Sequence, residues 1–92
     1  MPARKATVKS NPVTIVPIQC KLGRTALGWG VRELADEAGT SPNTVARFER
    51  GEAMLAATVE RLRQTMEVAG VEFIPENGGG AGVRLKKRKA KR

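Results

Sequence analysis

The sequence predicts a mainly α-helical domain of four to five helices, followed by a two-stranded β-hairpin and a basic tail. Three observations support this prediction. Between residues 17 and 70, apolar residues recur at helical spacing, with Gly and Pro between the segments. Residues 71–86 instead hold two short β-forming runs around a glycine-rich segment. The length of 92 residues fits one domain, because compact domains hold roughly 100–200 residues.

Glycine, proline and capping residues divide the helical part into segments. Pro17 suits the first turn of a helix, and Pro42 follows Ser41, whose hydroxyl can cap a helix N-terminus. Gly39 and Gly70 stand where helices end. The expected helices are therefore residues 18–27, 31–38, 42–49 and 56–69.

The last expected helix and the segment after it each show a regular pattern. Helical spacing gives the last helix one apolar face, which consists of Val59, Leu62, Met66 and Ala69. Residues 71–74 and 83–86 are the two runs expected to pair as a hairpin. Because an isolated two-stranded hairpin is marginal in water, it must pack on the helices or on another chain.

The formal net charge of +8 comes from 17 Lys and Arg against 9 Asp and Glu, and it is concentrated at the two ends. Residues 84–92 carry seven basic residues and residues 1–12 carry three, with no acid in either segment. The remaining seven basic and nine acidic residues make the body slightly acidic. Basic runs are usually solvated and often bind nucleic acid, and both interpretations stay open here. The expected divisions are a flexible basic arm (1–16), a helical domain (17–70), the hairpin (71–86) and a disordered basic tail (87–92).

Several classes of function are excluded by composition. The chain has no His and a single cysteine, Cys20, so an internal disulfide and His-based catalysis are excluded and a zinc site nearly so. We expect no enzyme, no cofactor and no metal site. No apolar run approaches the roughly 20 residues of a membrane helix, and residues 1–20 lack a signal-peptide core. We therefore expect a cytoplasmic protein that does not bind a membrane. Cys20 is expected to be a small, buried hydrophobic residue.

The most informative segment is residues 31–51, VRELADEAGTSPNTVARFERG. It reads as two short helices that Ala35 allows to approach closely and that Gly39 joins in a sharp turn. From residue 27 to residue 51 the chain carries L-G-W-x-x-x-E-L-A-x-x-A-G-x-S-x-x-T-V-x-x-F-E-x-G. This pattern closely resembles the helix-turn-helix domain of the lambda-repressor and Cro-like (XRE-type) regulators of bacteria and phages. The resemblance covers roughly residues 18–69.

The resemblance implies that the helix at residues 42–49 enters the major groove of DNA. Asn43, Thr44 and Arg47 match its base-reading positions. Their chemistry agrees, because Arg can bond to guanine O6 and N7 together and Asn can bond to adenine in the same way. The residues expected to contact the DNA backbone are Arg32, Ser41 and Arg50.

Other residues of the motif are expected to hold the domain together. Val45 and Phe48 point away from Asn43 and Arg47, into the core. The resemblance implies that Arg24 pairs with the Glu of F-E-x-G, here Glu49. Trp29 is expected to be a core or hinge residue.

Three positions depart from the family pattern. Gly30, Val31 and Pro42 stand where the family often carries polar residues. We therefore expect base readout to depend mainly on Arg47, with relaxed specificity or help from DNA shape.

Two functional hypotheses remain after these observations. The first is a sequence-specific transcriptional regulator, a small repressor that binds double-stranded DNA as a homodimer, because short domains read only a few base pairs each. Its dimer surface is expected on the hairpin, with the helix at 56–69 as the alternative. The second is a protein-binding regulator, antitoxin- or antiactivator-like, that sequesters a partner through its helix-turn-helix or hairpin surface. The hairpin residues expected at the dimer surface are Val71, Phe73, Val83 and Leu85.

Overall fold

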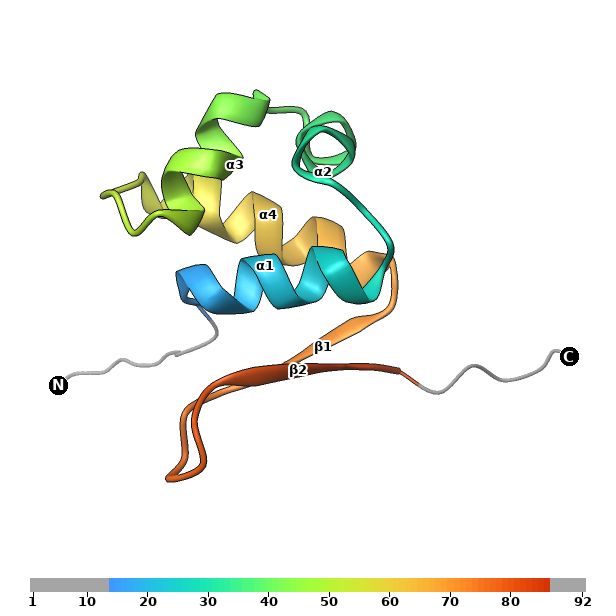
Figure 1. Cartoon of the computed structure of the whole chain (residues 1–92), viewed down its shortest axis with the longest axis vertical. Coiled ribbons are helices and arrows are strands. Elements are labelled where there is room, and N and C mark those ends of the chain that lie inside the picture. The colour runs from blue at the N-terminus through green and yellow to red at the C-terminus, as the bar shows by residue number, and fades with distance from the viewer. Residues whose placement is uncertain (1–13, 87–92) are drawn as a thin grey trace, which may run out of the picture.

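The computed structural model describes residues 14–86, which form four helices and one two-stranded antiparallel sheet (Figure 1). The helices are α1 (Pro17–Ala26), α2 (Val31–Ala38), α3 (Pro42–Glu49) and α4 (Ala56–Val68), and the strands are β1 (Val71–Ile74) and β2 (Gly82–Leu85). The predicted order of elements is confirmed, with four helices within the described residues. The expected bounds of α2, α3 and β1 match the structure. Those of α1 and β2 are shifted by one residue at both ends, and α4 ends one residue earlier than expected.

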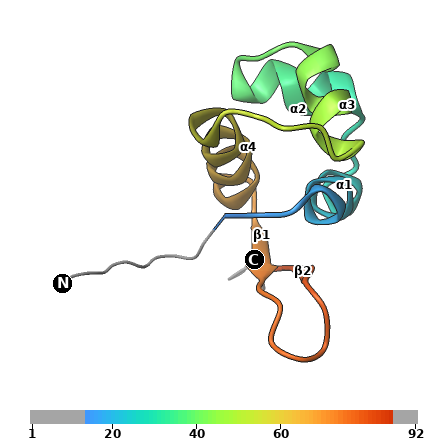
Figure 2. The same cartoon turned by 90° about the vertical axis from the view of Figure 1, so that its left-hand side faces the viewer.

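The elements lie in three levels. Helices α2 and α3 lie at the top in Figures 1 and 2, α1 and α4 lie beneath them, and the hairpin covers the underside of α1 and α4. The hairpin and the helix pair α2–α3 are thus on opposite sides of the molecule. Whatever binds to the exposed side of α3 leaves the hairpin accessible.

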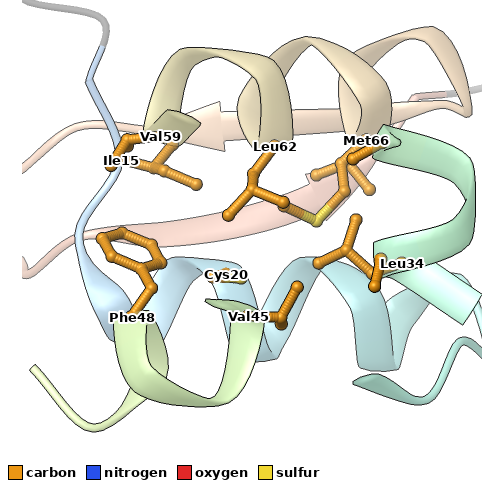
Figure 3. Close-up of a cluster of buried hydrophobic side chains, with 11 residues drawn as sticks. Ile15, Cys20, Leu34, Val45, Phe48, Val59, Leu62 and Met66 are labelled. Carbon is orange, nitrogen blue, oxygen red and sulfur yellow. The ribbon is translucent and has the colours of Figure 1, made fainter. Parts of the chain in front are cut away.

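The core lies between the four helices and the sheet (Figure 3). Ala69, the fourth residue of the predicted apolar face of α4, is only half-buried. The core residues from the helices α2, α3 and α4 are Leu34, Ala35, Ala38, Val45, Phe48, Val59, Leu62 and Met66. Ile15 also belongs to the core, with a relative exposure of 2%, and lies beside Val59 in Figure 3. The folded body therefore begins before residue 17, earlier than the expected end of the basic arm. The rest of that arm (1–13) and the tail (87–92) lie outside the described residues.

Two features of α1 fasten it to the hairpin. The Gln19 side chain is buried, and its Nε2 donates to the carbonyl oxygens of Ile74 and Gly82, each at 3.0 Å. At Gly23, α1 comes close to α4 and to the sheet. A Cβ atom there would lie 2.9 Å from Met66 Sδ and 3.3 Å from Phe73 Cε1. Only a residue without a side chain lets α1 pack this closely on α4 and the sheet.

The hairpin has one packed face and one solvent face. Residues 71 and 73 of β1 are opposite residues 85 and 83 of β2, and these four side chains share one face because side chains alternate along a strand. Val71 on that face is fully buried. On the other face Arg84 Nε lies 3.1 Å from Glu72 Oε1. The hairpin is therefore stabilised by packing on the helices, as its short length requires.

Candidate nucleic-acid interface

The turn between α2 and α3 sets the angle of the two helices. Gly39 has φ of +72°, a left-handed conformation that costs glycine little. The next amide, Thr40 N–H, donates to the Ala35 carbonyl at 2.9 Å and closes the end of α2. Ala35 itself is fully buried, so a small residue lies at the contact of the helices. This is the geometry of a helix-turn-helix unit.

The first turn of α3 is fixed by its own side chains. Ser41 Oγ accepts a hydrogen bond from Thr44 N–H at 3.1 Å and lies 2.9 Å from the Thr44 hydroxyl. Pro42 follows at the first helical position, where no N–H is needed. The predicted helix start is confirmed, and the Ser41 oxygen, expected at the DNA backbone, acts here as the cap of α3.

Helix α3 has an apolar face and a polar face. Val45 and Phe48 are buried in the core. Asn43 and Arg47, four residues apart, are both exposed on the polar face, and Thr44 is half-buried between them. The three residues predicted to read bases thus come from one helix, and two of them are free of the core.

A partly buried ion pair anchors α3 to α1 from the inner side. Arg24 Nε and Nη2 donate to the two carboxylate oxygens of Glu49 at 2.7 and 2.9 Å. The side chains are only 15% and 10% exposed, and the hydrogen bonds that Arg24 donates to Glu49 raise the pKa of Arg24. Arg24 Nη1 also donates to the Trp29 carbonyl at 3.3 Å. The predicted pair is confirmed, and it ties α3 to the turn before α2.

Cys20 lies against the same carboxylate. Its Sγ is 3.3 Å from Glu49 Oε2, and burial, followed by the hydrogen bond to Glu49, raises the pKa of the thiol well above its usual range. The predicted burial of Cys20 is confirmed. Because a protonated thiol is a poor nucleophile, Cys20 is a packing and hydrogen-bonding residue.

An exposed cluster of three charges lies at the C-terminal end of α3. Arg47 Nε donates to Glu52 Oε1 at 2.9 Å, and Arg50 Nε and Nη2 donate to Glu52 Oε2 at 3.2 and 3.0 Å. These hydrogen bonds lower the pKa of the Glu52 carboxyl, so it is ionised at neutral pH. One acidic residue therefore holds both a predicted base-reading residue and a predicted backbone contact.

The N-terminus of α2 adds one free basic side chain. Arg32 is exposed in the first turn, and within residues 14–86 it makes no salt bridge. Gly30 has no side-chain oxygen to cap the helix, but its own N–H donates to the Glu33 carboxylate. Arg32 is therefore available to an anion such as a DNA phosphate, while the carboxylate of Glu33 stays bonded to the chain.

The four hairpin residues predicted at a dimer surface differ in exposure. Val71 is fully buried and belongs to the protomer's own core, so it offers no surface to a second chain. Phe73 and Val83 are half-buried, and Leu85 is 52% exposed. The hairpin thus presents an apolar surface only toward the end of β2.

Sequence reasoning missed three polar side chains, of which Gln19 lies at the hairpin and Glu33 and Glu52 lie at α2 and α3. Gln19, three residues after Val16, has the spacing of a helix-capping residue, and its Oε1 does accept the Val16 N–H at 3.0 Å. Glu33 has the same relation to Gly30. The only sign of the role of Glu52 in the sequence is that it lies close to Arg47 and Arg50 along the chain. Its carboxylate faces α3 because the turn after the helix reverses, with the Glu52 N–H donating to the Arg47 carbonyl at 3.1 Å.

Two further observations concern residues 14–86 as a whole. In this part of the chain no three His, Cys, Asp or Glu side chains gather as metal ligands. None of its helices has the length and apolar character needed to cross a membrane.

Fold and site together define a DNA-binding domain of the helix-turn-helix class. Comparison with known families gives the same result, because the model of the family HTH_3, described as Helix-turn-helix, matches residues 21–72, more than half of the chain. The chain belongs to this Cro/C1-type, or XRE, family, which is not a family of enzymes. A search of curated proteins gives no match.

Proposed function

We propose that this protein is a sequence-specific transcriptional regulator, a small repressor, that reads the major groove with α3 as a homodimer. The observation that carries the proposal is the division of α3 into two faces. Its inner face is held by the core and by the Arg24–Glu49 pair, while Asn43 and Arg47 project from its outer face. A rigid helix with polar side chains on its free side suits base recognition, because contacts to base edges need fixed positions.

The base-reading residues have distinct roles in this proposal. Arg47 donates to guanine and Asn43 bonds to adenine, each through two hydrogen bonds. Thr44, half-buried at the start of α3, contributes a hydroxyl or its methyl group to a neighbouring base. With Pro42 in place of a polar residue, Arg47 carries the largest share of the specificity.

The DNA backbone is bound by basic and hydroxyl groups around α3. Arg50 and Arg32 neutralise phosphates, and Ser41, whose oxygen already accepts from Thr44 N–H, donates its hydroxyl hydrogen. The basic residues of segments 1–12 and 86–92 add affinity for any DNA sequence and make it dependent on salt. Since the target is DNA, the protein acts in the compartment that holds it.

The homodimer forms through the hairpin side in this proposal. Leu85 is 52% exposed at the end of β2, and Ile18 and Leu22 are 52% and 40% exposed on α1, the helix that packs on β2. Within the described residues β2 has one neighbouring strand, so its other edge is unpaired. An unpaired edge beside apolar side chains suits a second copy of the same strand. Phe73 and Val83 support this surface from beneath, and Val71 serves the protomer's own core.

Selection of bound sequences from a random DNA pool tests the proposal most directly. A consensus with two related half-sites about one helical turn apart is expected for a dimeric reader. The Arg47→Ala variant is expected to lose roughly 1–3 kcal/mol of binding free energy at the selected site and to relax one base position. Enrichment of no sequence contradicts base readout and favours the protein-binding alternative. An Arg47→Ala variant with the same consensus removes Arg47 from the readout.

The dimer surface is tested by light scattering on two point variants. Leu85→Asp places a charge at the proposed surface, and it is expected to give monomers. Val68→Asp places the same charge on α4, where Val68 is 90% exposed, and is expected to leave the dimer intact. The reverse pattern would assign the dimer to α4, and a monomeric wild-type protein would exclude both surfaces.

A further inference from the structure

The Arg47–Glu52–Arg50 cluster carries an inference beyond the overall function. Glu52 is not among the residues that the helix-turn-helix pattern singles out, and it lies in the turn after α3. Each of its carboxylate oxygens bonds to a different arginine, with Oε1 on Arg47 and Oε2 on Arg50. One acidic side chain thus links the proposed base reader with a proposed phosphate contact.

The cluster contributes little to folding. The side chains of Arg47 and Glu52 are 49% and 42% exposed, and that of Arg50 is 58% exposed. Exposed ion pairs gain little because water and salt screen them. An acidic side chain beside DNA-binding residues also repels phosphate. Any contribution of Glu52 to DNA binding must therefore come from its effect on Arg47 and Arg50.

The contact occupies one specific nitrogen of Arg47. Its Nε donates to Glu52 Oε1 at 2.9 Å, whereas within residues 14–86 neither Nη1 nor Nη2 of Arg47 makes a hydrogen bond. The guanidinium group is planar and presents its donors in a rigid fork. With Nε held by the protein, the two terminal nitrogens form the remaining pair for two parallel hydrogen bonds.

We propose that Glu52 is a positioning residue that fixes the Arg47 guanidinium so that Nη1 and Nη2 together address O6 and N7 of a guanine. The inference rests on the proposed function, since it takes Arg47 as a base reader. Glu52 raises specificity because it removes rotational freedom from a long side chain before DNA arrives. Its charge also repels phosphate, which lowers affinity for every DNA sequence alike and leaves the preference between sequences unchanged.

The turn that carries Glu52 is suited to this role. The Glu52 N–H donates to the Arg47 carbonyl at 3.1 Å, so its backbone is bonded to the residue that its side chain holds. The hydrogen bonds from Arg47 and Arg50 lower the pKa of its carboxyl, which keeps the carboxylate charged at neutral pH. Protonation of Glu52 therefore does not break the contact at neutral pH.

The experiment compares the wild-type protein with Glu52→Ala and Glu52→Gln on three DNA duplexes. The first duplex is the consensus that the wild-type protein selects from a random pool. The second carries a substitution at the base pair that Arg47→Ala identifies, and the third is a scrambled sequence. We measure the ratio of dissociation constants between the second duplex and the first, together with the dissociation constant for the third.

Glu52→Ala is expected to lower the ratio about tenfold, within the range that a bidentate contact supplies, and to bind the scrambled duplex more tightly. Glu52→Gln keeps an oxygen that accepts from Arg47 Nε without the charge. It is expected to keep the ratio within about threefold of wild type, while also binding the scrambled duplex more tightly. In an Arg47→Ala background, Glu52→Ala is expected to leave the ratio unchanged, because the effect passes through Arg47.

Other results contradict either the role of Glu52 or the proposed function, and the two cases can be told apart. An unchanged or raised ratio in Glu52→Ala overturns the inference, and so does a Glu52→Ala effect that persists without Arg47. If Arg47→Ala itself changes no base preference, the proposed base readout by Arg47 fails rather than the role of Glu52. Thermal unfolding of both variants is expected to match wild type, which separates positioning from loss of structure.

Discussion

Helix α3 carries two Arg–Glu pairs of the same chemistry on its two sides, and their surroundings give them different tasks. Arg24–Glu49 joins α3 to α1 with two hydrogen bonds and side chains only 15% and 10% exposed. Arg47–Glu52 lies on the outer side, with side chains 49% and 42% exposed. Arg47 and Glu49 are two residues apart, and therefore they point in different directions from the helix.

The difference shows how burial changes what an ion pair does. Loss of one partner of the inner pair leaves a charge in a poorly hydrated place, so the pair is needed for folding. Loss of one partner of the outer pair exposes a charge that water already reaches, so the fold tolerates it. The outer side of α3 is therefore free to serve binding, while the inner side is committed to structure.

The largest expected effect comes from breaking the inner pair. Glu49→Ala leaves the Arg24 guanidinium without its carboxylate and is expected to lower the free energy of unfolding by about 3 kcal/mol. Urea denaturation followed by circular dichroism measures the loss. The matched variant Glu52→Ala, which breaks the outer pairs, is expected to unfold at the wild-type urea concentration. Equal losses in the two variants would remove the distinction between the pairs.

A second pair of variants compares apolar and polar positions of α3. Val45 is fully buried, and Val45→Ala is expected to cost about 2 kcal/mol of stability through lost contacts and a cavity. Asn43 is exposed, and Asn43→Ala is expected to keep wild-type stability while it weakens binding to the selected DNA by roughly 1–3 kcal/mol. Thermal unfolding and fluorescence anisotropy with the selected duplex separate these effects. Asn43→Ala with wild-type affinity would remove Asn43 from the readout.

Ser41 caps the N-terminus of α3 and is also proposed to contact a DNA phosphate. Two substitutions separate these roles. Ser41→Ala removes the cap that Thr44 N–H donates to and is expected to cost about 1 kcal/mol of stability. Ser41→Asp keeps a capping oxygen and is expected to retain stability, yet its charge should weaken binding to every DNA sequence by repelling phosphate. Unfolding and binding measured on both variants test this. An Asp variant with wild-type DNA affinity would place Ser41 away from the phosphates.

The smallest expected effect concerns Cys20 at the inner pair. Because burial and Glu49 raise the pKa of the thiol, its alkylation by iodoacetamide at pH 8 is expected to be at least about tenfold slower than in urea. The raised pKa means that the protonated thiol is favoured in the folded state. Its contribution to stability is therefore complete below the ordinary thiol pKa of about 8.5 and declines as the pH rises above it. Rapid alkylation of the folded protein would contradict the buried environment.

Much of the fold follows from local features of the sequence. Gly39, Ser41 and Pro42 set the end of α2 and the start of α3, because each has a conformational or hydrogen-bonding property that acts within one turn. The hairpin is likewise visible as two β-forming runs around glycines. The burial of Ile15 was not predicted, since a single apolar residue in an irregular segment has no periodicity to reveal it.

The candidate site was only partly predictable for a related reason. Asn43, Thr44 and Arg47 follow from their places in a motif of fixed spacing. Gln19 acts across elements, and a polar residue's partner in another element leaves no mark near it in the chain. The partners of Glu52 are near it in the chain, but no position of the motif singles Glu52 out. Gln19 bonds to carbonyl groups more than 50 residues away in sequence. Val71 shows the same limit, because its apolar character suits a dimer surface and a protomer's core equally well.

The sequence by itself determined the class of fold, the order of the elements and the residues that α3 offers to a partner, because helix periods, caps and glycine turns are local. Only the tertiary structure decided which of two Arg–Glu pairs is mostly covered and that Val71 is committed to the core. Exposure depends on how the elements pack, and the local features of a sequence do not fix it. The contact of Glu52 with Arg47 Nε is local, but which atoms it joins follows only from the folded turn after α3.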